Sequence, residues 1–176
     1  MMSLNKYISY ISILCIIIDP LTYWLLFNSL TININEFNKK VIISMKSSII
    51  SLILHILTIF FGNNILTIVD IPIYAMKITG GLSLLNTSYY IINSKNKEYH
   101  LLDGDEYVDR GKIYIYPLST GILAGPGTLC TLIILSNECN NFMDYCIIIV
   151  SSITVIMICF LGTLLSKYIS KINNDI

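Results

Sequence analysis

The chain is poor in charged residues. Asp, Glu, Lys and Arg together make up 12% of its 176 residues, against the ~25% that is typical of soluble domains. The formal net charge is zero, and no basic stripe runs outside the polar loops, so a nucleic-acid partner is not expected. In contrast, 55% of the residues are hydrophobic and the mean hydropathy is +0.72. This composition excludes an ordinary soluble domain and predicts an all-α, polytopic bundle of transmembrane helices surrounded by the lipid bilayer.

The sequence also lacks the patterns of an enzyme or a metalloprotein. No Ser-His-Asp set, phosphate-binding glycine loop or metal-ligand spacing is present, so no catalytic activity, no cofactor and no metal are predicted. The five cysteines show no C-x-x-C spacing. They are interpreted as apolar fillers or free thiols, with a Cys139–Cys146 disulfide as the alternative in an oxidising compartment. An intramembrane enzyme would need a nucleophile with a base in reach. The only candidate is His55, which we interpret as a packed or interhelical hydrogen-bonded histidine.

Five apolar segments approach the ~20 residues that a helix needs to cross a bilayer. They cover residues 4–27, 41–61, 71–92, 113–135 and 142–165. The second segment carries a stripe of serines, and the long polar loop 93–112 separates the third segment from the fourth. The first segment is too long and too interrupted for a cleavable signal peptide, so it is predicted to be a retained helix.

Lysine and arginine are distributed unevenly among the loops. They occur between the first two segments, in the loop 93–112 and after the last segment, whereas the loops 62–70 and 136–145 contain neither. Basic residues concentrate on the cytoplasmic side of membrane proteins. The first loop, the loop 93–112 and the C-terminus are therefore predicted to be cytoplasmic, and the N-terminus is predicted to lie outside.

Two of the apolar segments are interrupted where a membrane helix should be continuous. The first contains Asp19-Pro20, and the fourth contains Gly125-Pro126-Gly127. Proline removes a backbone donor, and freed backbone groups are costly in lipid unless they face protein or a wet cavity. A pair of broken helices, one in each half of the chain, is the best sequence indication of a transporter's binding site.

Asp19 is the main candidate for a binding residue. A carboxylate within an apolar span costs ~2.5–3.5 kcal/mol on insertion scales and indicates a functional site by default. Two compatible interpretations remain open: Asp19 binds a solute, or it caps the amides freed at the break. At the second break, the amides that follow Gly125, as far as Thr128, could bind an anion as helix N-termini do. A simple kink is the alternative there.

The third apolar segment adds two further candidates. Lys77 is interpreted either as a lysine that reaches to the outer interface or as a partner for Asp19 or an anionic substrate group. Gly80-Gly81 either allows two helices to approach closely or is merely tolerated, as glycine often is in membrane helices.

The motifs of the chain resemble those of the MarC family of inner-membrane proteins. The match covers nearly the whole chain and keeps the order Asp19-Pro20-Leu21, Lys77-Ile78-Thr79-Gly80-Gly81, Pro117 and Ala124-Gly125-Pro126-Gly127-Thr128. The resemblance implies a location in the cell (inner) membrane and a six-span fold of two inverted three-helix halves, related to the LysE-type transporters. It also implies transport of small solutes, with neutral amino acids as the best guess for the substrate. The predicted substrate-binding residues are Asp19, Pro20, Lys77, Gly80, Gly81, Gly125, Pro126, Gly127 and Thr128.

The chain departs from the family pattern in several places. Thr22 and Leu25 stand where the family has Gly and Pro, Lys77 stands for an Arg, and Gly121 stands for the second Pro of the fourth-span motif. Thr22 is expected to block close backbone approach at the first break. The sixth span is also missing, so only five spans are predicted. Either another copy of the chain supplies the packing, as a homo-oligomer, or the protein is a degenerate, non-transporting membrane protein kept for an interaction or under relaxed selection.

Overall fold

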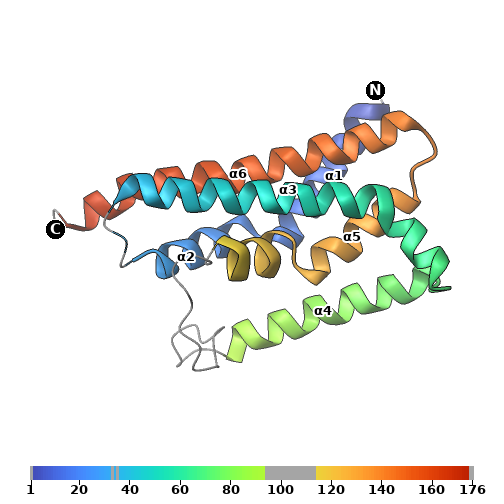
Figure 1. The fold of residues 1–176 in the computed structure, drawn as a ribbon, viewed down its shortest axis with the longest axis horizontal. Coiled ribbons are helices and arrows are strands. Elements are labelled where there is room, and N and C mark those ends of the chain that lie inside the picture. The colour runs from blue at the N-terminus through green and yellow to red at the C-terminus, as the bar shows by residue number, and fades with distance from the viewer. Residues whose placement is uncertain (1, 33, 35, 94–113, 175–176) are drawn as a thin grey trace.

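The computed structural model describes the chain except for residues 1, 33, 35, 94–113 and 175–176. The described residues form helices and no strands (Figure 1). The elements are α1 (Met2–Ile18), α2 (Pro20–Leu30), α3 (Phe37–Ile68), α4 (Ile73–Asn93), the π-type helix η1 (Tyr114–Leu123), α5 (Pro126–Asn137) and α6 (Phe142–Asn174). Within η1 the backbone is kinked at Tyr116, which is extended (φ −134°, ψ 132°). The all-α prediction is therefore confirmed. The loop predicted to be cytoplasmic lies, apart from Asn93, outside the described residues.

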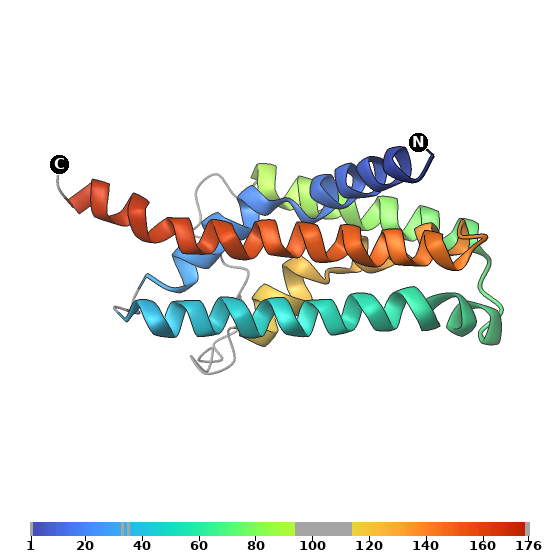
Figure 2. The same cartoon turned by 90° about the horizontal axis from the view of Figure 1, so that it is seen from above.

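Two long antiparallel helices, α3 and α6, pack against each other along one side of the molecule (Figures 1 and 2). The short elements pack against them: α1 and α2 lie against α6, while η1 and α5 lie against α3. Helix α4 makes its main contacts with α5 and runs along the outside of the bundle (Figure 1). This arrangement brings the end of α1 and the start of α5 close to α4.

The inward face of α3 is polar, whereas its outward face is apolar. Its buried residues include Ser44, Ser47, Ser48, Ser51 and His55, and its exposed residues include Ile42, Met45, Ile49, Ile53 and Phe60. This pattern is the reverse of that in a water-soluble protein, where the apolar side chains would be buried and the polar ones exposed. In a bilayer, small polar residues let helix backbones approach one another, and apolar side chains face the lipid. The packing of α3 is thus the packing of a membrane helix.

Three stretches of the described chain are long and apolar enough to cross a membrane, namely Leu4–Leu30, Phe37–Ile68 and Phe142–Leu164. The pair η1 and α5, bent by 48° at its break, would form a fourth. These stretches correspond to the predicted segments 4–27, 41–61, 142–165 and 113–135. The predicted segment 71–92 coincides with α4, which is helical but does not pass the same test. The count of five spans and the inverted repeat therefore stay predictions.

The cysteines are free thiols, so the alternative of a Cys139–Cys146 disulfide is wrong. Cys139 lies between α5 and α6, and its Sγ donates a hydrogen bond to the Leu135 carbonyl at 3.4 Å. Burial, together with the nearby charge of Asp144, raises the pKa of the Cys139 thiol to about 11. This thiol therefore stays protonated and weakly reactive at neutral pH.

Candidate solute-binding site

The first break separates α1 from α2 at Asp19. Asp19 adopts the left-handed backbone conformation with φ 48° and ψ 81° and is the N-cap of α2. Pro20 follows at the first helical position, where a backbone N–H would have no partner within the helix. The Asp19 carboxylate accepts two hydrogen bonds from Thr22, one from the backbone N–H at 3.4 Å and one from Oγ1 at 2.6 Å. The capping interpretation of Asp19 is thus confirmed.

The second break separates η1 from α5 at Gly125. Gly125 is the N-cap of α5 with an extended backbone (φ −66°, ψ 166°), and Pro126 is the first helical residue. The first intrahelical bond runs from the Leu129 N–H to the Gly125 carbonyl at 3.0 Å. No backbone bond from the N–H of Gly127 or Thr128 is found in the described part of the chain. The first turn of α5 therefore has free donors, as at other helix N-termini.

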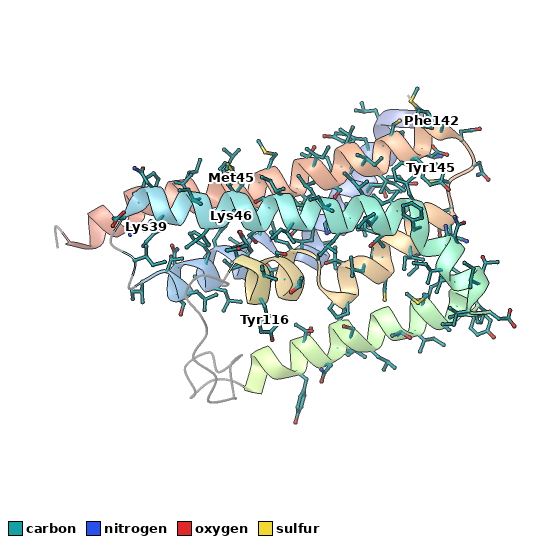
Figure 3. All side chains as sticks on the ribbon, viewed as in Figure 1. Lys39, Met45, Lys46, Tyr116, Phe142 and Tyr145 are labelled. Atoms are coloured by element: carbon teal, nitrogen blue, oxygen red, sulfur yellow. The ribbon has the colours of Figure 1, made fainter. Side chains whose placement is uncertain are left out.

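Both breaks line one cavity of about 330 Å³. This size lies at the lower end of the ~300–1,000 Å³ of small-molecule sites. The first break contributes Asp19 and Thr22, and the second contributes Gly125, Pro126, Gly127 and Thr128. Helix α4 adds the hydroxyls of Ser83, Thr87 and Ser88, and η1 adds Tyr116, whose side chain projects from η1 toward α4 (Figure 3). A carboxylate, free amides and several hydroxyls therefore surround one space.

Comparison with known proteins gives the chain a family. A family profile described as "MarC family integral membrane protein" matches residues 4–175. The chain belongs to the MarC family. The UPF0056 membrane protein YvbG of Bacillus subtilis is 30% identical over 132 residues, which are 73% of this chain and 63% of that protein. The chain thus spans less than two thirds of this relative.

Two further relatives come from other organisms. A UPF0056 membrane protein of Buchnera aphidicola subsp. Schizaphis graminum is 25% identical, with 96% of this chain and 84% of that protein covered. One of Archaeoglobus fulgidus is 27% identical, with 90% and 75% covered. No solved structure matches the chain. The chain is therefore an integral membrane protein of the MarC family, and the names of these relatives identify no substrate.

The structure places the MarC motif residues in two groups. Asp19 and all four residues from Gly125 to Thr128 line the cavity. Pro20, Lys77, Gly80 and Gly81 do not line it. Lys77 is exposed on α4, and within the described residues it forms no ion pair with Asp19. A Cβ at Gly80 would lie 3.1 Å from the Cys130 Cβ, so Gly80 serves the close approach of α4 to α5.

Several cavity residues were not predicted from the sequence. Ser83, Thr87 and Ser88 lie on one face of α4, because residues four apart in a helix lie above one another. The signal that could have found them is this i, i+4, i+5 spacing of hydroxyls in an otherwise apolar segment. Thr22 was recognised only as a departure from the MarC pattern, yet its hydroxyl binds the Asp19 carboxylate.

His55 is a buried interhelical hydrogen-bonding residue, as predicted. Its Nε2 lies 2.9 Å from the Leu123 carbonyl oxygen, and its Nδ1 lies 2.7 Å from Ser152 Oγ. A carbonyl oxygen only accepts, so Nε2 carries the hydrogen, and the Ser152 hydroxyl donates to Nδ1 of the neutral imidazole. Nothing in the sequence indicates that the partner of His55 is the backbone at the second break.

Gly125 and Gly81 offer a matched pair of alanine substitutions. A Cβ at Gly125 would lie 2.8 Å from the Gly121 carbonyl oxygen, whereas a Cβ at Gly81 has nothing within 4 Å. Gly125→Ala is expected to shift the second break and lower the free energy of unfolding by about 1–3 kcal/mol. Gly81→Ala should leave stability unchanged or raise it by about 0.5–1 kcal/mol, because alanine favours the helix. Unfolding in detergent followed by circular dichroism measures both, and equal stability of the two variants would contradict the close contact at Gly125.

Proposed function

We propose that this MarC protein transports small zwitterionic solutes, neutral amino acids first, across the cell membrane, with its N-terminus outside and its C-terminus in the cytoplasm. One observation carries the proposal: a single cavity is lined by the carboxylate of one broken helix and by the free amides of another. The Asp19 carboxylate matches the ammonium group of an amino acid. The N-terminus of α5 matches its carboxylate, because free amides and the helix dipole favour an anion.

The rest of the cavity supports a small and uncharged side chain. The polar groups that α4 presents are hydroxyls rather than charges, and apolar residues such as Ile17, Leu26 and Leu84 complete the lining. Gly127 allows α5 to lie close to Leu84 on α4, since a Cβ there would lie 2.9 Å from Leu84 Cδ2. A solute with a net charge would leave one charge without a partner, which is costly in such surroundings.

We propose transport rather than catalysis. The distance of 2.7 Å between Ser152 Oγ and His55 Nδ1 resembles a nucleophile beside a base, yet both residues are at most 2% exposed. The cavity lining includes neither of them. The second ring nitrogen of His55 is occupied by a backbone carbonyl, whereas a catalytic base is usually oriented by a third side chain and open to substrate.

Counterflow in proteoliposomes tests the proposal whatever the direction of transport and the coupling ion. Vesicles loaded with unlabelled L-alanine should accumulate labelled L-alanine through the wild-type protein, and the doubly substituted protein Asp19→Asn with Gly125→Leu should not. The single tryptophan, Trp24, lies two residues from Thr22 and should report binding of L-alanine by a change in fluorescence. If alanine, glycine and serine all fail to exchange and leave the fluorescence unchanged, the non-transporting alternative is favoured.

A further inference from the structure

The second break contains a carbonyl that would normally occupy the amide of Gly127. In a continuous α-helix, each carbonyl accepts from the N–H four residues later, so the Leu123 carbonyl would pair with the N–H of Gly127. That pairing is not made. The Leu123 carbonyl accepts instead from His55 Nε2 at 2.9 Å. The donor to the Leu123 carbonyl thus comes from another helix, α3.

The position of His55 is fixed from three sides. Its side chain is fully buried on α3, one ring nitrogen holds the end of η1, and the other accepts from Ser152 on α6 at 2.7 Å. α3 and α6 are also joined by a second buried bond, between Ser44 Oγ and Thr163 Oγ1 at 2.8 Å. The imidazole is therefore held by the two longest helices, α3 and α6. Through its bond to the Leu123 carbonyl, it links these helices to the end of η1 at the second break.

We propose that His55 is a positioning residue for the solute site. By occupying the Leu123 carbonyl, it keeps this carbonyl from pairing with the N–H of Gly127 and leaves that N–H free for the carboxylate of a solute. His55 itself does not touch the solute. The inference rests on the proposed function for the identity of the ligand, but the state of the Gly127 amide does not depend on it.

The amide of Gly127 can be observed directly. The chain has nine glycines, so protein labelled with ¹⁵N-glycine in detergent gives a simple amide spectrum, and the Gly127 peak is assigned by its loss in Gly127→Ala. In wild type this amide should exchange rapidly with solvent, and it should shift when L-alanine is added. In His55→Leu it should gain the Leu123 carbonyl as a partner and exchange at roughly a tenth of the wild-type rate or less.

Two further variants separate positioning from general destabilisation. His55→Gln keeps an N–H donor near the place of Nε2, so it should retain the rapid exchange of the Gly127 amide and an alanine affinity within about threefold of wild type. Ser44→Ala removes the other buried α3–α6 bond, which lies away from the break, and should leave the Gly127 amide unchanged even where it lowers stability. His55→Leu should weaken alanine binding about tenfold, which corresponds to the loss of one charge-assisted hydrogen bond.

The outcomes distinguish this inference from the proposed function. Slow exchange of the Gly127 amide in His55→Leu, with rapid exchange in His55→Gln and Ser44→Ala, supports the role of His55 even if no amino acid binds to any variant. An unchanged Gly127 amide in folded His55→Leu overturns it. If His55→Leu does not fold, a folded His55→Gln with a protected Gly127 amide overturns it as well. Failure of wild type to bind alanine counts against the proposed function alone.

Discussion

Asp19→Asn is expected to weaken the binding of a neutral amino acid roughly ten- to hundred-fold while the fold stays intact. Asparagine tolerates the left-handed conformation that Asp19 adopts at φ 48°, and it is an equally good N-cap. Its side-chain oxygen can still accept from Thr22. What is lost is the negative charge opposite the ammonium group, and a hydrogen bond to a charged group contributes more than one between neutral groups. Titration of Trp24 fluorescence with L-alanine measures the affinity.

The chain supplies a matched control for this substitution. Asp70, in the turn between α3 and α4, is the other described aspartate with a positive φ, at 57°, and it does not line the cavity. Asp70→Asn makes the same chemical change on the same kind of backbone and should leave alanine affinity unchanged. Equal affinities for wild type, Asp19→Asn and Asp70→Asn would remove Asp19 from the binding site and leave it as a cap alone.

Both breaks could be predicted from the sequence because proline acts locally. Pro20 and Pro126 each lack the N–H that an uninterrupted helix would use, so each is expected to kink or interrupt the helix. The structure places both at the first position of a new helix. The capping role of Asp19 was predictable for the same reason, since it depends on a residue only three positions away.

The orientation of α4 could not be predicted, and with it the role of Lys77. Successive residues in a helix point in directions about 100° apart, so the cavity face of α4 depends on how α4 packs on α5. Gly80 permits that packing, since a Cβ there would lie 3.1 Å from the Cys130 Cβ. The packing directs Ser83 and Thr87 to the cavity and leaves Lys77 exposed. No pattern within the segment 71–92 specifies the partner helix.

The departures from the MarC motif also gained a physical meaning only in three dimensions. Thr22 was expected to obstruct the first break, but its hydroxyl lies 2.6 Å from the Asp19 carboxylate and helps to hold it. Trp24, a bulky residue just after the first break, also has a structural role. Its Nε1 donates a hydrogen bond to the Cys159 carbonyl on α6 at 2.9 Å. The residue that makes room for it, Gly162, lies far away in the sequence.

The contact between Trp24 and Gly162 leads to the second large expected effect. A Cβ at Gly162 would overlap the indole ring of Trp24, which is also held by the hydrogen bond from its Nε1 to the Cys159 carbonyl. Gly162→Ala should therefore lower the free energy of unfolding by about 1–3 kcal/mol, as overpacking does in other cores. Gly81→Ala, with open space around its Cβ, is the control for the general effect of alanine in a helix.

A double-mutant cycle shows whether Trp24 is the cause. Trp24→Leu removes the ring, so Gly162→Ala should cost little in that background, and the two substitutions should couple by about 1 kcal/mol or more. Unfolding followed by circular dichroism measures all four proteins, because two of them lack the tryptophan. If the cost of Gly162→Ala is the same with and without Trp24, the indole is not seated on Gly162. If the coupling is found, the bulky residue after the first break and the glycine on α6 form one packing unit, which fixes α2, and with it the cap at Asp19, against the longest helix of the bundle.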